Sequence, residues 1–222
     1  MSHYFSRAQL VVRPRDSELL RNLASHGDAY RDHALVWRLF PGDGLPRDFI
    51  FRRDLDALGR PVYFIVSRRP PQTDSGLLQV QSKAYRPQLS VGEWLRFDLR
   101  ANPTISRKVE GKSSRRHDVL MDAKRRAGSP VQVQQAVDAA GLAWLLERSV
   151  NWGLEVAGDS VLQSAYQQHR LHPRGKRIEY SSLDYQGFAR VVDPQRLQQA
   201  LLEGVGHGKG FGCGLLLVKR VS

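Results

Sequence analysis

The sequence has few cysteines and no long hydrophobic run, and both absences exclude classes of protein. Its single cysteine, Cys213, excludes an internal disulfide and any zinc site built from several cysteines. The longest unbroken aliphatic run, Leu215–Val218, is far shorter than the about 20 apolar residues that a membrane-spanning helix needs. The first residues, MSHYFSRAQLVV, lack the apolar core and the cleavage site of a signal peptide. We therefore expect a cytoplasmic protein.

Acidic side chains are also scarce relative to basic ones. The chain carries 34 Lys and Arg against 22 Asp and Glu, which gives a net charge of +12 and a pI near 10.3. Such an excess predicts a polyanionic partner. No stretch has the pattern of a basic amphipathic helix with bulky apolar residues opposite, so nucleic acid is favoured over a membrane. Hydrophobic residues make up 41% of the chain, which is enough for a folded core.

Hydrophobic patterning divides the chain into two similar halves. The first half has strands at 3–12, 49–53, 62–67 and 77–85, a short helix after Asp16 and a helix from Tyr30 to Phe40. The second half has strands at 94–100, 160–171, 177–192 and 215–218, a helix at 133–150 and a helix between Asp193 and Gly204. The order β, α, β, β, α, β is that of a ferredoxin-like domain. We therefore predict an α+β fold of two tandem ferredoxin-like (RRM-like) domains, 1–87 and 88–222, the first with a degenerate second helix.

The helix that begins at Tyr30 carries two side chains that can transfer protons. At about 100° per residue, Leu35, Val36, Leu39 and Phe40 form one apolar stripe. Tyr30, His33 and Trp37 lie on the neighbouring face. A histidine beside an apolar stripe is more often structural than catalytic, so the pattern alone leaves both roles open.

A glycine-rich stretch, GVGHGKGFGCG, runs from Gly204 to Gly214. Its glycines are Gly204, Gly206, Gly208, Gly210, Gly212 and Gly214. A flexible loop before an edge strand is one interpretation. Because so many glycines are costly to order, we favour close approach of backbone N–H groups to an anion, assisted by Lys209. The spacing matches neither a P-loop nor a dinucleotide-binding fingerprint.

Basic residues concentrate in the second half. Between residues 96 and 126 the sequence has ten Lys and Arg against four Asp and Glu. We expect these side chains and those of the 160–192 hairpin to contact RNA phosphates. The predicted contacts are Arg100, Lys108, Lys112, Arg115, Arg116, Arg170, Arg174, Lys176 and Arg177. The hairpin is also the best candidate for entering a groove of an RNA stem.

Four motifs occur together along the chain. They are Tyr-x-x-His-x-x-x-Trp-x-Leu-Phe-Pro at 30–41, LRANP at 99–103, AWL at 143–145 and GVGxGKxxGxGLL near the C-terminus. In this order and at these separations they resemble CasE, the CRISPR-associated endoribonuclease of the type I-E Cascade complex. The resemblance implies tandem ferredoxin-like domains and cleavage of CRISPR repeat RNA at the 3′ base of a stem-loop, without metal or cofactor. It also implies that the enzyme stays bound to its product, beside other Cascade subunits.

The resemblance assigns roles to particular residues. The family's catalytic histidine corresponds to His33 and its accompanying tyrosine to Tyr30. Its stem-contacting basic pair corresponds to His169 and Arg170, and Asn102 belongs to the LRANP motif.

The hypothesis that follows is attack of a ribose 2′-OH on the adjacent phosphorus, with His33 as general acid or base. Tyr30 orients the hydroxyl or contacts a phosphoryl oxygen, while Lys209, Arg31 or loop amides stabilise the developing charge. The products are a 2′,3′-cyclic phosphate or 3′-phosphate and a 5′-hydroxyl.

Two alternatives remain open at this point. One is a non-catalytic RNA-binding subunit of a ribonucleoprotein, in which His33 is inert. The other is a metal-dependent nuclease that uses Asp54 with Asp56, or Asp118 with Asp122, although neither pair has an evident third ligand.

Overall fold

The computed structural model describes residues 2–11, 16–25, 27–42, 44–73, 76–109, 112–171 and 178–221. For residues 24, 107–109, 112–115, 130 and 131 it describes the backbone only.

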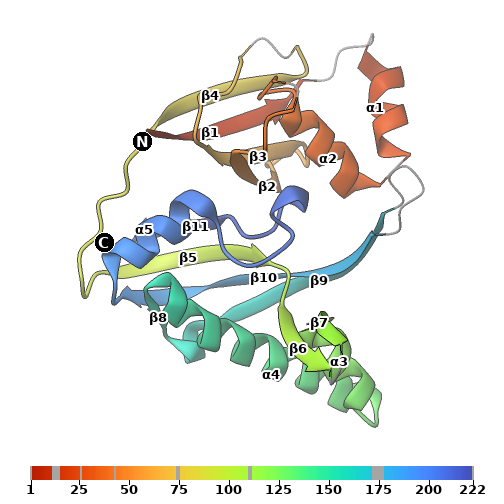
Figure 1. Ribbon diagram of the computed structural model, residues 1–222, viewed down its shortest axis with the longest axis vertical. Helices are drawn as coiled ribbons and strands as arrows, with labels where there is room; N and C mark the ends of the chain where they lie inside the picture. The colour runs from red at the N-terminus through yellow and green to blue at the C-terminus, as the bar shows by residue number, and fades with distance from the viewer. Residues whose placement is uncertain are drawn as a thin grey trace.

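The first domain is a four-stranded antiparallel sheet with two helices (Figure 1). Its elements are β1 (His3–Leu10), α1 (Ser17–Ala24), α2 (Asp28–Trp37), β2 (Phe49–Leu55), β3 (Pro61–Ser67) and β4 (Leu78–Tyr85). The strand order is β2-β3-β1-β4. The predicted apolar stripe is buried: Leu35 and Val36 of α2, and Leu39 and Phe40 of the turn after it, are at most 1% exposed and pack in the core of this sheet. The helix itself ends at Trp37, before the predicted end at Phe40.

The second domain has a larger sheet, seen below the first in Figure 1. Its elements are β5 (Trp94–Ala101), β6 (Thr104–Val109), β7 (Lys112–Asp118), α3 (Val119–Arg126), α4 (Pro130–Ser149), β8 (Leu154–Val156), β9 (Leu162–Leu171), β10 (Ile178–Val191), α5 (Pro194–Glu203) and β11 (Leu216–Arg220). The strand order is β11-β5-β10-β8, and β9 also pairs with β10. Helix α5 begins and ends where the sequence predicts. The Asp193 side chain accepts hydrogen bonds from two backbone amides of the first turn, and Gly204 ends the helix.

The two sheets have equivalent topologies. From one edge to the other, the first sheet has the order β4-β1-β3-β2, and the second has the order β11-β5-β10 followed by β8 and β9, which both pair with β10. If β8 and β9 count as one strand, each domain has its own fourth strand at the edge, followed by its first, third and second strands. In the first domain, the described part of the connection between β3 and β4, residues 68–73 and 76–77, contains no helix. The predicted fold class, with a degenerate second helix in the first domain, is therefore confirmed. The exact boundary at residues 87 and 88 stays a prediction.

The basic segment contains elements that the sequence analysis did not assign. Strands β6 and β7 form a separate two-stranded sheet, and α3 follows directly, capped by the Asp118 side chain. Strand β7 (KSSRRHD) has no apolar residue and β6 (TISRKV) has only Ile105 and Val109, so there is no apolar alternation from which to predict them.

The two domains pack against each other through a small apolar cluster. Ile50 and Val66 of the first sheet are buried together with Leu215, just before β11. Helix α5 also contacts β3. This packing holds the loop between α5 and β11 against the first domain, where its short 3-10 turn (Lys209–Phe211) contacts both β2 and α2.

Candidate active site

His33 lies where α2 of the first domain meets the glycine-rich loop of the second. Its Nδ1 is 2.7 Å from the carbonyl oxygen of Gly210, and its Nε2 is 2.8 Å from the indole Nε1 of Trp37. An indole N–H can only donate, so Nε2 accepts and Nδ1 carries the proton that is donated to Gly210. The contacts therefore favour one neutral tautomer of His33.

The surroundings of His33 also disfavour its charged form. Burial lowers the pKa of His33, and the nearby Arg47 guanidinium lowers it further, while the Gly210 carbonyl opposes these two effects. The pKa therefore lies below the ordinary value near 6.5. A neutral imidazole with its Nε2 lone pair available, once Trp37 releases it, can accept a proton.

Tyr30 stands one helical turn before His33 on α2 and is half-buried. Side chains three residues apart on a helix lie on the same side, so Tyr30 and His33 share the side of α2 that the sequence predicts.

Arg31 is held by carboxylates of its own helix. Its guanidinium is 2.9 Å from Asp28 and 3.3 Å from Asp32. Asp32 is itself buried and accepts a hydrogen bond from the Tyr63 hydroxyl at 2.8 Å. Arg31 thus anchors the first turns of α2 in this structure, and its predicted contact with RNA remains a prediction.

Arg47 is a basic residue near His33 that the sequence analysis missed. A Cβ atom placed on Gly210 would lie 2.5 Å from a terminal guanidinium nitrogen of Arg47 and 3.8 Å from Nδ1 of His33. Arg47 lies between α2 and β2, in a segment without hydrophobic periodicity, so the sequence carries no signal for its position.

The glycine-rich loop presents a carbonyl rather than an amide to His33. Its backbone amides at Val205, Phe211 and Gly214 donate to carbonyl oxygens of Gly214, Gly208 and Arg100 respectively. These three amides are engaged in hydrogen bonds within the protein, and the anion-binding role of the glycine-rich stretch stays a prediction. Lys209 donates to the backbone carbonyl of Glu203 at 2.9 Å, and burial lowers its pKa.

Gly214 is required for the path of this loop. Its φ of +87° is unfavourable for residues with a side chain, and an added Cβ would lie 2.3 Å from the carbonyl oxygen of Val205. The tight crossing of the chain at this point brings Gly210 to His33.

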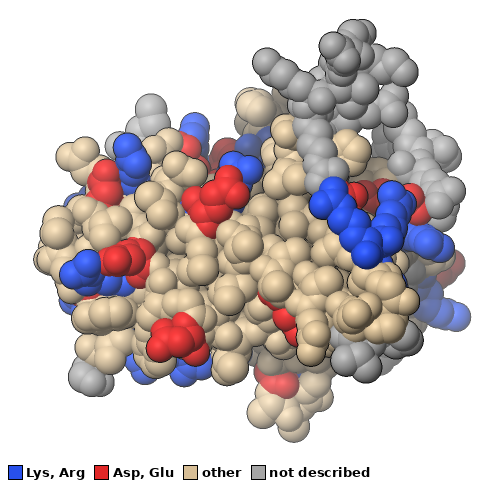
Figure 2. All heavy atoms as spheres, turned by 90° about the horizontal axis from the view of Figure 1, so that it is seen from below, with Lys and Arg blue, Asp and Glu red and all other residues tan. Residues whose placement is uncertain are grey.

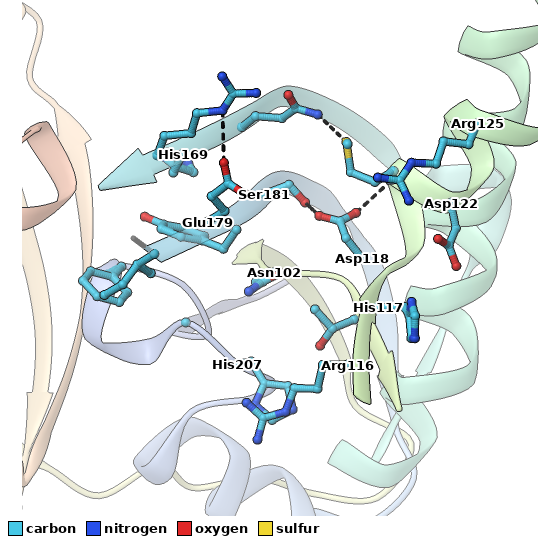
Figure 3. Close-up of a pocket in the computed structure, with 18 residues that line it drawn as sticks. Asn102, Arg116, His117, Asp118, Asp122, Arg125, His169, Glu179, Ser181 and His207 are labelled. Carbon is cyan, nitrogen blue, oxygen red and sulfur yellow. Dashed lines mark hydrogen bonds and ion pairs between the residues drawn. The ribbon is translucent and has the colours of Figure 1, made fainter. Parts of the chain in front are cut away.

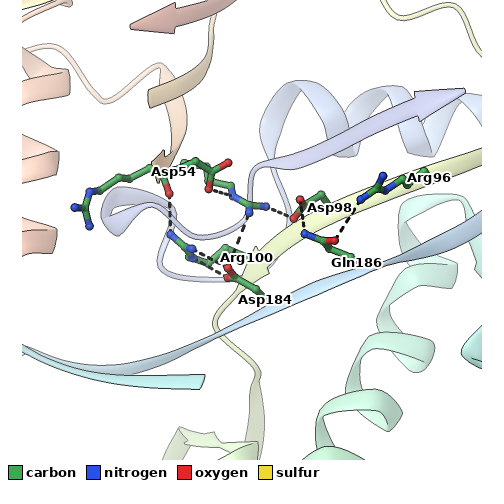
Figure 4. Close-up of polar contacts among 8 residues, drawn as sticks. Asp54, Arg96, Asp98, Arg100, Asp184 and Gln186 are labelled. Atoms are coloured by element: carbon green, nitrogen blue, oxygen red, sulfur yellow. Dashed lines mark hydrogen bonds and ion pairs between the residues drawn. The ribbon is translucent and has the colours of Figure 1, made fainter. Parts of the chain in front are cut away.

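Arg100 belongs to an ion network that joins the two domains (Figure 4). Its Nε and one terminal nitrogen each lie 2.7 Å from an oxygen of Asp184, and its other terminal nitrogen donates to the carbonyl of Arg53 in the first domain. Arg52 of β2 is 4% exposed, contacts Asp98 of β5 and lies 2.8 Å from Asp54. Arg100 thus has a structural role at the junction of the two domains, and its contact with a phosphate stays a prediction.

The hairpin predicted at 160–192 is formed by β9 and β10 and carries His169 and Arg170. His169 hydrogen-bonds Ser182 through Nε2 at 2.8 Å, and burial lowers its pKa. Arg170 is 68% exposed and pairs loosely with Glu179 at 3.3 Å. Of these two, Arg170 has the accessible charge that a phosphate contact needs.

A row of five rings joins the predicted catalytic helix to this hairpin. The ring of Phe211 lies 5.9 Å from that of His33 and 5.5 Å from that of Tyr180, which stacks on His169 at 4.4 Å. Trp37 extends the row beyond His33, at 6.0 Å. The structure thus brings His33 and His169 to the same interdomain region, through Phe211 and Tyr180, which the sequence analysis did not single out.

The remaining predicted basic residues are only partly described. Lys108, Lys112 and Arg115 lie on the β6–β7 hairpin, where the structure describes the backbone only. Arg116 is exposed at the end of the same hairpin. Arg174, Lys176 and Arg177 lie outside the described residues. Figure 2 views one face of the molecule and shows basic side chains gathered at one end, with acidic and basic side chains mixed elsewhere.

The two aspartate pairs considered for metal binding have other partners. Asp56 accepts hydrogen bonds in the turn before β3, and Asp118 caps α3. Among the residues that the structure describes, no three His, Cys, Asp or Glu side chains form a group that could hold a metal ion. In the same part of the chain, no helix is long and apolar enough to cross a membrane.

Comparisons with known proteins agree on one family. Residues 3–220 match the family model described as CRISPR associated protein. The chain is 28% identical to the CRISPR-associated endoribonuclease Cse3 of Thermus thermophilus over 95% of this chain and 97% of the relative. It is 27% identical to the Cascade subunit CasE of Escherichia coli over 85% of this chain and 90% of that protein.

Solved structures show the same similarity. The T. thermophilus Cse3 structure bound to an RNA that represents a pre-cleavage complex has a TM-score of 0.70 at 26% identity, covering 99% of this chain and 100% of the other. The E. coli Cas6e crystal structure has a TM-score of 0.66 at 22% identity and covers 98% and 100%, which supports the fold.

Proposed function

Since the chain belongs to the family of CRISPR-associated proteins, we propose that it is an endoribonuclease that cuts CRISPR repeat RNA by a metal-independent mechanism. The family resemblance seen in its motifs is confirmed by the family model and by both curated relatives. The observation that carries the proposed mechanism is the placement of His33, held in one neutral tautomer between Trp37 and Gly210.

The chemistry requires no external nucleophile, because the ribose 2′-OH attacks the adjacent phosphorus. His33 acts as the general base: Nδ1–H stays bonded to the Gly210 carbonyl, and Nε2 takes the proton of the 2′-OH. The RNA must displace the Trp37 indole from Nε2 for this step. The P–O5′ bond then breaks, the leaving 5′-oxygen takes a proton from water, and the protonated His33 returns its proton to solvent, which leaves a 2′,3′-cyclic phosphate and a 5′-hydroxyl.

Two basic groups are suited to stabilise charge on the phosphoryl oxygens. The Arg47 guanidinium lies over Gly210, beside His33. Lys209 is on the same loop, tethered to Glu203. Tyr30, on the same side of α2, orients the 2′-OH or contacts a phosphoryl oxygen. Positioned charges of this kind act without reorganisation during the reaction.

RNA binding is assigned to the second domain. Arg170 on the β9–β10 hairpin and the basic side chains of the β6–β7 hairpin contact phosphates of the stem, and His169 stands beside Arg170. The bound product is the guide RNA, cut at the 3′ base of the stem-loop. The protein keeps this RNA within a Cascade assembly, in the cytoplasm.

The test is a cleavage assay in excess EDTA with a stem-loop RNA of the CRISPR repeat from the same genome. We expect one cut at the 3′ base of the stem and a cyclic phosphate or 3′-phosphate product. His33→Ala should lower the single-turnover rate by about 10²–10⁴ while binding by gel shift is unchanged. His3→Ala, at the start of β1 and opposite Tyr85 of β4, serves as the matched control.

Two results would contradict this proposal. Cleavage that stops in EDTA would exclude the metal-independent mechanism. Tight binding without cleavage by either protein would favour a non-catalytic RNA-binding subunit and reduce Tyr30 and His33 to packing residues.

A further inference from the structure

A cavity of about 490 Å³ lies in the second domain, next to the aromatic row. It is enclosed by the β6–β7 hairpin, α3, the β9–β10 hairpin and the glycine-rich loop (Figure 3). The rings of His169, Tyr180 and Phe211 line one side of it. Its volume falls in the range of about 300–1,000 Å³ that is typical of small-molecule sites.

Two buried polar atoms of this cavity have no hydrogen-bond partner in the part of the chain that the structure describes. They are Oδ1 of Asn102 and the hydroxyl oxygen of Tyr180. Asn102 is 7% exposed, and Figure 3 shows it at the centre of the cavity, between the hairpin and His207 of the loop. Native proteins seldom leave buried polar groups unpaired, so two of them at one cavity point to a ligand that supplies their partners.

The chemistry of these atoms selects the kind of ligand. The amide oxygen can only accept a hydrogen bond, whereas the phenol can donate one. An acceptor oxygen repels a phosphoryl oxygen, so a phosphate does not supply the partner that Asn102 Oδ1 lacks. A nucleobase fits, since its edge places an N–H donor beside a ring nitrogen or carbonyl acceptor and its planar body matches an aromatic wall.

The cavity is also close to the proposed site of cleavage. Phe211 lines the cavity, and its ring is only 5.9 Å from that of His33. An RNA strand whose scissile phosphate lies at His33 therefore has a neighbouring nucleotide within reach of Asn102. The exposed Arg116 and Arg170 lie at the rim, where the strand's phosphates would pass.

We propose that this cavity holds the base of one unpaired nucleotide next to the scissile phosphate, with its donor on Asn102 Oδ1 and its acceptor on the Tyr180 hydroxyl. The site recognises the base of the nucleotide that flanks the stem, and this recognition is separate from binding of the stem itself. This inference rests on the proposed function, because it needs RNA bound at His33.

The test combines a scan of the RNA with conservative variants of the protein. The probe is the fluorescently labelled repeat stem-loop with a 2′-deoxy nucleotide at the cut, in which each unpaired nucleotide near the cut is replaced in turn by an abasic one. The proteins are wild type, Tyr180→Phe, Asn102→Ala and the double variant. Tyr185→Phe is the matched control, since its buried hydroxyl already donates to the Gly141 carbonyl at 3.0 Å.

We expect one abasic position to weaken binding about 10-fold to wild type and hardly at all to the double variant, because the lost base and the lost side chains share the same two hydrogen bonds. Tyr180→Phe should lose affinity for intact RNA by a few-fold without a lower melting temperature. Tyr185→Phe should melt earlier and keep the full abasic penalty.

The proposed base-binding site is refuted if no abasic position weakens RNA binding, or if the loss of affinity is the same for wild type and the double variant. If the all-ribose RNA is still cut in that case, the proposed function stands and only this inference fails. If wild type neither binds nor cuts the repeat RNA, both fail together.

Discussion

Replacing Arg52 by methionine should loosen the junction between the two domains. The guanidinium is buried and contacts Asp54 and Asp98, with Asp184 at 3.9 Å. Burial alone would lower the pKa of Arg52, but these carboxylates outweigh that effect and raise it. Methionine keeps most of the volume and removes the charge, which leaves Asp54 and Asp98 without this cation, whereas Asp184 keeps its pair with Arg100.

Removing one partner of a buried ion pair costs about 3–5 kcal/mol, because the other charge stays buried and uncompensated. For a chain of this length each kcal/mol lowers the melting temperature by about 2–4 °C, so Arg52→Met should melt about 6–20 °C below wild type. The measurement is differential scanning calorimetry at neutral pH. Cleavage should weaken as well, since Gly210 reaches His33 only while the domains are docked.

Arg190→Met provides the matched control for this prediction. Arg190 of β10 pairs with Glu155 of the neighbouring strand β8 at 2.5 Å, but both side chains are about half exposed. Such a surface pair contributes at most about 1 kcal/mol. Equal melting temperatures for the Arg52 and Arg190 variants would refute the idea that the buried network holds the domains together.

Four further predictions concern the site. The pKa of His33 is lowered, and we assign it the role of a base. The single-turnover cleavage rate should therefore be constant above pH 6.5 and fall only at lower pH, where the imidazole becomes protonated. A cleavage rate that falls at higher pH would indicate a general acid instead. Trp37→Phe removes the N–H that stabilises the neutral imidazole in the free protein, so the midpoint of the His33 titration without RNA, followed by NMR, should move up; an unchanged midpoint would argue against the Trp37 contact. Gly214→Ala should cost about 2–3 kcal/mol of stability in denaturant unfolding, given its positive φ and the nearby Val205 carbonyl; an unaffected midpoint would contradict the loop geometry. Arg170→Ala should reduce the slope of log K against log salt for RNA binding by about 1, whereas an unchanged slope would exclude a phosphate contact.

The regular elements could be predicted because their signals are local. The apolar stripe of α2 follows helical spacing, and α5 is bounded by Asp193, Pro194 and Gly204. The repeated β, α, β, β, α, β order then leads to the tandem fold. Strands β6 and β7 could not be predicted in this way, since β7 is polar throughout and β6 has only Ile105 and Val109 as apolar residues.

The candidate site could be predicted only in part. The motif and helical spacing identify His33, but not its partner: Gly210 is 177 residues away, and no local pattern shows that its carbonyl rather than an amide faces the imidazole. Arg100 is a similar case. Its charge suggests a phosphate contact, whereas folding pairs it with Asp184, 84 residues further along the chain.

The hydrogen bond between His33 and Gly210 has a consequence for the order of events during protein synthesis. The ribosome releases α2 long before it has made the loop, so a nascent chain carries the imidazole without the carbonyl that selects its tautomer. Both domains must be synthesised and docked before the site exists. A half-made chain therefore lacks the complete site that we propose for RNA cleavage.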